Sequence, residues 1–310
     1  MILPRFRVRP TVAALLLAAL CLRTHGDPGG GSVPAAMAFA RTMPQTVLWA
    51  WEEPEDLRAA PAASTGVAYL AETILLDTNQ DVGKAQAGSP AVITRSRHQP
   101  LAVAPGAAVM AVVRIIAQPG FRDSPELREQ TADALAEVAQ RPGLRALQID
   151  FDATRSQRAF YAAVLRILRP RMPANMPLSI TALLSWCAAE HGSGGWLGEL
   201  PVDEAVPMFF RLGGSARPGD DKSGYTLREP LCQGSVGIST DESWPALNAR
   251  QRVYLFAPRP WTAAQLEAVD SVKADRRPAA LAYDNRGIAL HAVNDTGLHA
   301  PQPADRENAP

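Results

Sequence analysis

In the stretch LQIDFD, residues 147–152, apolar and polar residues alternate without a break. Successive side chains of a β-strand point to opposite faces, so such a strand has one apolar face and one polar face. The stretch 178–185 alternates in the same way, apart from Leu183. Strands of a doubly wound parallel sheet are apolar on both faces, whereas barrel strands can turn polar residues into the lumen. We therefore expect a barrel rather than a doubly wound or an all-β sheet.

Short apolar runs bounded by turn residues are the candidate strands. They are Thr46–Trp51, Gly66–Ala71, Val109–Ile116, Arg145–Asp152, Leu178–Trp186, Ala205–Phe210, Ser235–Thr240 and Arg252–Ala257. Apolar residues at helical spacing predict helices that begin at Pro125 after the N-cap Ser124, at Ser156 and at Thr262. Strands that alternate with helices over roughly 250 residues are typical of a (β/α)8, TIM-like barrel.

Some segments depart from this regular alternation. Irregular loops are expected near Ser193–Leu200 and Arg217–Leu231, in place of helices. Leu76–Gln99 has the pattern of an inserted hairpin, and Leu281–Leu290 that of an additional strand pair. The expected fold is thus an α/β TIM-like barrel with irregular loops and a small β extension.

The start of the chain has the pattern of a targeting segment. Arginines precede the eleven-residue apolar run Val12–Leu22, and a membrane-spanning helix needs about 20 apolar residues. Residues 1–26 are therefore predicted to be a secretory signal peptide, with an uncleaved anchor or a lipid on Cys21 as alternatives. The other predicted ranges are a flexible linker (27–44), the barrel (45–290) and a disordered tail (291–310). We expect an exported protein, periplasmic or extracellular.

The charge balance argues against one class of partner. The chain has 31 Lys and Arg residues and 31 Asp and Glu residues, and the signal peptide carries four Arg and no acid. A mildly negative mature chain lacks the positive excess that neutralises phosphates, so no nucleic-acid partner is expected. We expect the mature chain to be a monomer without a membrane span.

Export also determines how the cysteines are interpreted. Once the signal peptide is removed, Cys187 and Cys232 are the remaining pair. Disulfides form in oxidising compartments, so we predict a bridge between them, with two buried free thiols as the alternative. The bridge would stabilise the fold by up to roughly 4 kcal/mol in the chain-entropy model.

The strongest candidate site is the pair Asp150 and Asp152. Two carboxylates two positions apart on one strand share a face, with Cβ atoms roughly 6–7 Å apart. At the carboxyl end of a barrel strand they would lie where TIM-barrel enzymes react. Like charges so placed raise the pKa of one carboxyl, which leaves a protonated acid beside an ionised partner. The alternative is structural: Asp152 caps the next loop, and Asp150 pairs with Arg114 in the preceding strand.

Other candidate site residues lie at predicted strand ends and in loops. Glu52 and Glu242 are acids that follow strands, and Trp51 and Trp186 offer flat apolar faces to sugar rings. Arg114, the lone charge in an apolar run, is a further candidate for substrate binding. His191 lies in a glycine-rich loop that could close over a ligand. Glu72 also follows a predicted strand, whereas Asp203 and Glu204 precede one and are expected to form salt bridges or caps.

Several cofactor motifs are absent from the sequence. There is no P-loop, no G-x-G-x-x-G, no H-E-x-x-H, no paired CxxC and no G-x-S-x-G elbow. No metal and no cofactor is therefore expected. A metal-dependent hydrolase built on Asp150, Asp152 and His191 is a minor hypothesis, because the ligand spacing is unspecific.

The sequence resembles a family of secreted bacterial proteins, domain of unknown function 3142. The residues that carry this resemblance are Trp49–Glu52, Leu147–Asp152, Leu178–Cys187, Val202–Glu204, Pro207, Met208 and Ser239–Glu242. It implies a glycoside-hydrolase-like barrel over about residues 45–290. The fourth-strand acids also look like the D-x-x-D-x-D-x-E motif of chitinase-type glycosidases, with Leu147 in place of the first Asp and Thr154 in place of the final Glu.

Two functions follow from these residues. The first is a secreted glycosidase that acts on a glycan or polysaccharide, with Asp152 as general acid, Asp150 as the neighbour that sets its pKa, and Glu52 or Glu242 as the opposing carboxylate. The second is a non-catalytic carbohydrate-binding barrel. The acids at the strand ends favour the first function, and Thr154 in place of the Glu favours the second.

Overall fold

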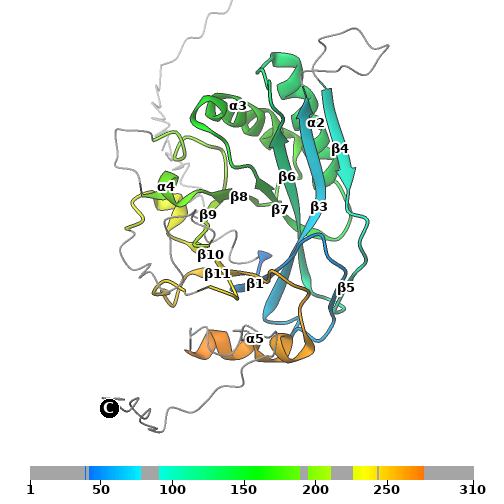
Figure 1. The fold of residues 1–310 in the computed structure, drawn as a ribbon, viewed down its shortest axis with the longest axis vertical. Helices are drawn as coiled ribbons and strands as arrows, with labels where there is room; N and C mark the ends of the chain where they lie inside the picture. The colour runs from blue at the N-terminus through cyan, green and yellow to red at the C-terminus, as the bar shows by residue number, and fades with distance from the viewer. Residues whose placement is uncertain are drawn as a thin grey trace, which may run out of the picture. The chain divides into compact units, whose positions relative to one another are not determined.

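Eight parallel strands form a nearly closed barrel in the computed structural model, which describes residues 39, 42–77, 91–188, 195–210, 226–242 and 244–275. The strands are β1 (Thr46–Ala50), β3 (Thr65–Asp77), β6 (Ala108–Ala117), β7 (Leu144–Asp150), β8 (Leu178–Ala182), β9 (Glu204–Pro207), β10 (Ser235–Ser239) and β11 (Arg252–Phe256). They are hydrogen-bonded in the order β10-β11-β1-β3-β6-β7-β8-β9 (Figure 1). The two ends of this row meet where Met208 forms a parallel bridge with Gly237. This closed parallel order confirms the TIM-like barrel.

Helices connect several of the strands. They are α2 (Pro125–Ala139), α3 (Arg158–Leu168), α4 (Leu184–Cys187) and α5 (Ala263–Asp275). Three 3-10 turns accompany them, η1 (Arg155–Gln157), η2 (Arg169–Arg171) and η4 (Pro230–Cys232). The first helix begins as its sequence predicts, because Ser124 accepts a hydrogen bond from the Leu127 N–H at 3.1 Å and Pro125 opens the helix.

The alternating stretches divide their side chains as expected. The apolar residues of the first stretch are buried in the layer between the barrel and helices α2 and α3. They are Leu147 and Ile149 of β7 and Phe151 just after it. Gln148 and Asp150 point the opposite way, where they bond to Ser179 and Thr181 of β8. The polar lumen face predicted from residues 147–152 is therefore confirmed as far as Asp150, the last residue of β7.

Apolar side chains and one ion pair fill the amino-terminal end of the lumen. Phe39 and Met43, within the range 27–44 predicted to be a linker, are both buried among lumen residues. Arg252 lies 2.7 Å from Glu204 and donates to the Met43 and Pro44 carbonyls. Glu204 also accepts hydrogen bonds from Tyr254 and Ser179. Glu204 thus forms the structural salt bridge that its position predicts, as does Asp203, which pairs with Arg169.

The structure corrects several strand ends. The predicted strands 145–152 and 205–210 end at Asp150 and Pro207. The predicted strand 178–186 ends at Ala182, and Leu183 is the N-cap of α4; the break in alternation at Leu183 marks this change. The predicted strand 66–71 continues to Asp77, so Glu72 does not follow the strand but lies inside β3, where it pairs with Arg141. A bulge between Leu70 and Glu72 shifts the register, and the strand turns its face there.

The predicted hairpin is present in the described residues. The last six residues of β3, Glu72–Asp77, pair antiparallel with β4 (Ala91–Ser96). A second, two-stranded parallel sheet joins β2 (Glu55–Leu57) to β5 (Leu101–Val103). The signal peptide 1–26, Cys21, His191, the strand pair 281–290 and the tail 291–310 lie outside the described residues.

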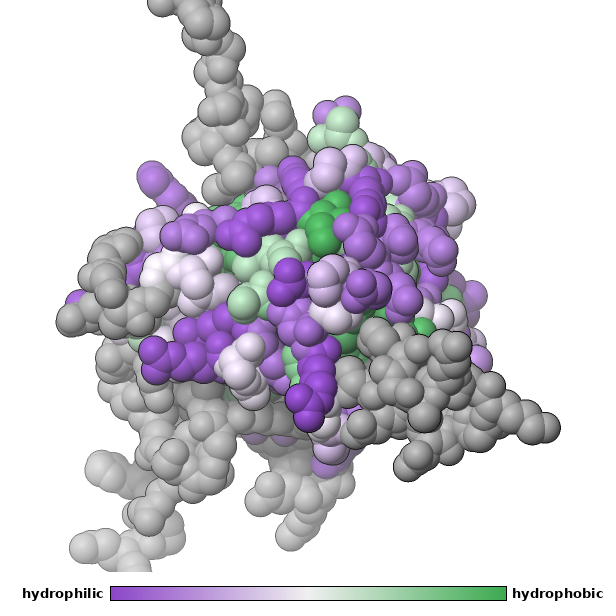
Figure 2. All heavy atoms as spheres, turned by 90° about the horizontal axis from the view of Figure 1, so that it is seen from above, coloured by the Kyte–Doolittle hydropathy of each residue, from purple (hydrophilic) through white to green (hydrophobic). Residues whose placement is uncertain are grey.

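The carboxyl ends of the parallel strands form what we call the mouth of the barrel. Figure 2 views the molecule from above and shows a small group of apolar residues bordered by polar ones.

In the described part of the chain, no helix combines the length and apolar character needed to cross a membrane.

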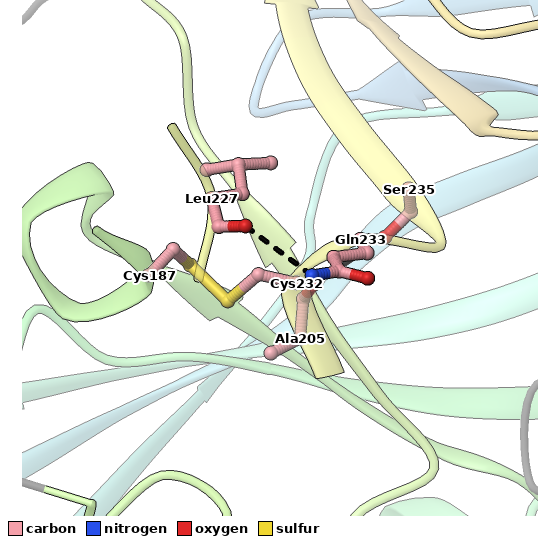
Figure 3. Close-up of a disulfide and its surroundings, with 6 residues drawn as sticks. All are labelled: Cys187, Ala205, Leu227, Cys232, Gln233 and Ser235. Carbon is pink, nitrogen blue, oxygen red and sulfur yellow. Dashed lines mark hydrogen bonds between the residues drawn. A yellow bond between two sulfur atoms is a disulfide. The ribbon is translucent and has the colours of Figure 1, made fainter. Parts of the chain in front are cut away.

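The predicted disulfide is present (Figure 3). Cys187 at the end of α4 bonds to Cys232 in η4, with their Cα atoms 5.8 Å apart. The backbone N–H groups of Arg228 and Glu229 both donate to the Cys187 carbonyl. The bridge therefore fastens the segment after β8 to the segment before β10.

Candidate functional site

Asp150 and Arg114 form the polar centre of the mouth. Arg114 of β6 is the register partner of Asp150 on β7, and its Nε lies 3.9 Å from Asp150 Oδ2. Thr181 of β8 donates to Asp150 Oδ1 at 2.8 Å. The Asp150 side chain is 15% exposed and that of Arg114 is 39% exposed. The pairing of Asp150 with Arg114 is therefore present, although at 3.9 Å it is a loose ion pair open to solvent.

Burial raises the pKa of Asp150 from 3.8 to about 6. The nearby negative charge of Asp152 acts in the same direction, while the Thr181 hydrogen bond and the Arg114 charge lower it. Asp150 can therefore be protonated near neutral pH, where it would donate a hydrogen bond instead of accepting one. The general acid hypothesised from the sequence is Asp152, whereas the raised pKa belongs to Asp150.

Asp152 lies just beyond the strand and is exposed. With Asp150, Arg114, Ile116, Thr154 and Gln157 it lines a pocket of about 230 Å³. Gln157 accepts a hydrogen bond from the Thr154 N–H at 2.8 Å, so this pair, not Asp152, caps the following turn. Asp152 makes no hydrogen bond or ion pair with the residues that the structure describes, and its carboxylate is open to a ligand.

An aromatic cluster lies beside this polar centre, at the top of the lumen. Trp51 stacks on Trp49 with ring centroids 5.8 Å apart, and both meet the edge of Phe256. Phe210 stacks on Phe256 at 5.3 Å. The guanidinium of Arg114 lies over the Trp51 ring, 5.3 Å from its centroid. Trp51 therefore contacts Arg114 directly, and the face of its ring attracts the guanidinium charge.

The structure brings together four of the predicted site residues, namely Asp150, Asp152, Arg114 and Trp51. Trp186 does not join them: it is buried in the layer outside the barrel, against Trp196 and under Arg158. Glu52 follows β1 and is exposed, and Glu242 lies after β10, three strands around the ring from β7.

Sequence reasoning did not single out Thr181, Gln157 or Phe256 as site residues. Thr181 could have been found, because its place in the second alternating stretch puts it on the lumen face beside Asp150. Phe256 has no comparable local signal, since it meets Trp51 only when β11 pairs with β1. Within the described ranges, no group of three or more His, Cys, Asp or Glu residues could hold a metal ion.

Comparison with known families locates the resemblance on this part of the chain. Residues 105–196 match the model of the family described as domain of unknown function (DUF3142). This confirms the resemblance expected from the sequence over that segment. The DUF3142 segment contains Arg114, Asp150 and Asp152, so the polar centre of the mouth lies within it. The chain matches none of the curated proteins with which it was compared.

Solved structures with a similar arrangement include chitinase-type proteins. A putative chitinase A from Streptomyces coelicolor is 11% identical, with 76% of this chain and 98% of that chain covered and a TM-score of 0.42. A family GH18 chitinase from Chromobacterium violaceum is 12% identical, with 82% and 91% covered and a TM-score of 0.38. The spore cortex-lytic enzyme SleL of Bacillus cereus is 14% identical, with 78% and 63% covered and a TM-score of 0.37. The barrel assignment follows from the strand order and not from these similarities.

Proposed function

We propose that the mouth of the barrel binds a glycan. The observation that supports this is the convergence of Arg114, Asp150 and Asp152 on one pocket. Thr181 of the next strand bonds to Asp150, and the ring of Trp51 lies under Arg114. Ligand sites combine apolar walls with a few placed polar groups. Carboxylate and guanidinium groups fixed in this way can each form two hydrogen bonds with neighbouring hydroxyls.

Each residue has a distinct part in this proposal. Arg114, held on Trp51, donates to ligand oxygens, and Asp152 accepts from hydroxyls. Asp150 accepts or donates according to pH, since burial raises its pKa to about 6. Trp51 acts mainly through Arg114, because that guanidinium and Trp49 already lie against its ring. Export through residues 1–26 remains part of the proposal, and the Cys187–Cys232 bridge supports an oxidising compartment.

Hydrolysis of the glycan is the second candidate function. It is favoured by the raised pKa of Asp150 beside the carboxylate of Asp152, because a general acid must hold a proton near the working pH. Asp150 would then be the acid in place of Asp152. Glycosidases need a second carboxyl group across the bond, and Glu52 and Glu242 are the candidates for that role.

A glycan array followed by hydrolysis assays tests both functions. We expect wild type to bind and Asp152→Asn to weaken binding, while Glu137→Gln on the exposed face of α2 leaves it unchanged as a matched acid-to-amide control. Release of reducing ends by wild type but not by Asp150→Asn would add the catalytic role. Absence of binding to every glycan on the array would contradict the proposal.

A further inference from the structure

Two strands of the barrel extend far beyond their neighbours at the mouth. β3 has 13 residues and β6 has 10, whereas the strands beside them, β1 and β7, have 5 and 7. Together with β4 they rise past the mouth as a three-stranded wall (Figure 1). One face of this wall is covered, because Ile74, Leu76 and Ile115 are buried in the same layer as the apolar residues of α2.

The other face of the wall continues the surface of the lumen. Its residues alternate with the buried ones and are half-buried or exposed. They are Thr73, Leu75, Ile93, Arg95, Arg114 and Ile116. Ile93 is 37% exposed and is one of only two large apolar side chains exposed to this degree in the described part of the chain. No helix or loop among the described residues covers this face as α2 covers the opposite one.

The strand register arranges these residues in two rows. The polar row crosses four strands. Its members are successive register partners, namely Arg95, Thr73, Arg114 and Asp150. A second, apolar row lies closer to the carboxyl ends of β3 and β6. It consists of Ile93, Leu75 and Ile116, which are also register partners. Since strands lie about 4.8 Å apart, the polar row runs about 14 Å from Asp150 to Arg95.

Two pockets follow these rows. The pocket at Asp150 reaches Ile116 and Ala117 on β6. A second cavity of about 440 Å³ begins next to them and is lined by Leu75, Ile93, Arg95, Gln118 and Pro119. The end of β6 thus lines the first pocket, and the two residues that directly follow it, Gln118 and Pro119, line the second. A ligand chain leaving the mouth along β6 would pass directly from the first pocket to the second.

The geometry points to this wall as a second binding subsite for the same glycan, so that the ligand is a polysaccharide chain rather than a mono- or disaccharide. Sugar units beyond the one at Asp150 would pack on Ile93 and Leu75 and accept hydrogen bonds from Arg95. The polar row leads from Arg95 to Asp150 without a break. The ligand that occupies the wall is therefore a continuation of the glycan bound at Asp150. This inference rests on the proposed glycan-binding function and specifies the length of its ligand.

The test measures affinity against ligand length by calorimetry. The probes are homo-oligomers of N-acetylglucosamine, of glucose and of galacturonic acid, each from disaccharide to octasaccharide. For the series that binds, we expect Ile93→Ser and Arg95→Ala each to lower affinity for the long oligomers by about tenfold, as expected for loss of one contact of ordinary strength. Affinity for the shortest oligomer that binds should not change.

The control is Thr94→Ala, an exposed residue of the same strand whose side chain points to the opposite face. It should match wild type at every length. If Ile93→Ser and Arg95→Ala match wild type for long and short oligomers alike, the wall is not a subsite, while glycan binding at the mouth stands. If wild type binds no oligomer in any series, the proposed function is contradicted, and the subsite with it.

Discussion

At the scale of single residues, Asp150 is the side chain on which the proposed site and the pH dependence of stability depend most. Its carboxyl is mostly buried and has one hydrogen bond, from Thr181, and one loose ion pair, with Arg114. The alternation of residues 147–152 was sufficient to place it on the lumen face. It could not reveal which of the two aspartates is buried, because that depends on where β7 ends. Nor could it show that Trp186 faces the outer layer, because Trp186 lies in α4, where the alternation of a strand no longer applies.

Asp150 should make stability depend on pH. Its pKa is about 6 in the folded protein against an ordinary 3.8, so the folded state holds this proton more tightly than the unfolded state. Stability therefore falls as pH rises from about 4 to about 6, by up to about 3 kcal/mol. Asp150→Asn removes this titration, and its free energy of unfolding relative to wild type should rise over that range. Urea denaturation at pH 4 and pH 7 measures the difference.

The exposed acid-to-amide change Glu137→Gln serves as control for that experiment, and it should shift stability by less than about 0.5 kcal/mol at both pH values. Equal differences between Asp150→Asn and wild type at pH 4 and pH 7 would show that Asp150 is not buried in the way described.

At the scale of elements, the sequence predicts those whose signals are local. The helix that begins after Ser124 and all eight barrel strands are found because caps and alternation are short-range patterns. Boundaries set by tertiary contacts are missed. β3 runs past Ala71 because β4 and β6 pair with its continuation, and Glu72 is tolerated there because Arg141 meets it.

The Cys187–Cys232 bridge is the element-scale feature most open to test. It closes a loop of 45 residues and fastens α4 to η4. We expect the double variant Cys187→Ala, Cys232→Ala to lose about 2–4 kcal/mol of unfolding free energy. A reductant should destabilise wild type and leave the double variant unchanged, as urea denaturation with and without dithiothreitol would show. A wild type that is indifferent to reductant would mean that the bridge is not formed in solution.

At the scale of the whole barrel, closure depends on contacts between residues far apart in the sequence. Arg252 of β11 pairs with Glu204 of β9 and also holds the carbonyls of Met43 and Pro44 ahead of β1. One buried guanidinium therefore ties together three segments at the amino-terminal end of the barrel. The sequence could suggest a salt bridge for Glu204, but its partner 48 positions away could be identified only from the ring order.

Breaking this pair should destabilise the entire barrel cooperatively, because both partners are about 95% buried. Glu204→Gln keeps the side-chain shape but leaves Arg252 charged without a counter-ion, and we expect a loss of about 3–5 kcal/mol. A double-mutant cycle with Arg252→Gln separates the pair from its surroundings. Because the two residues touch, the cycle should show a coupling above about 1 kcal/mol. Additive single losses would mean that Glu204 and Arg252 stabilise the barrel separately, through Tyr254 and through the chain before β1.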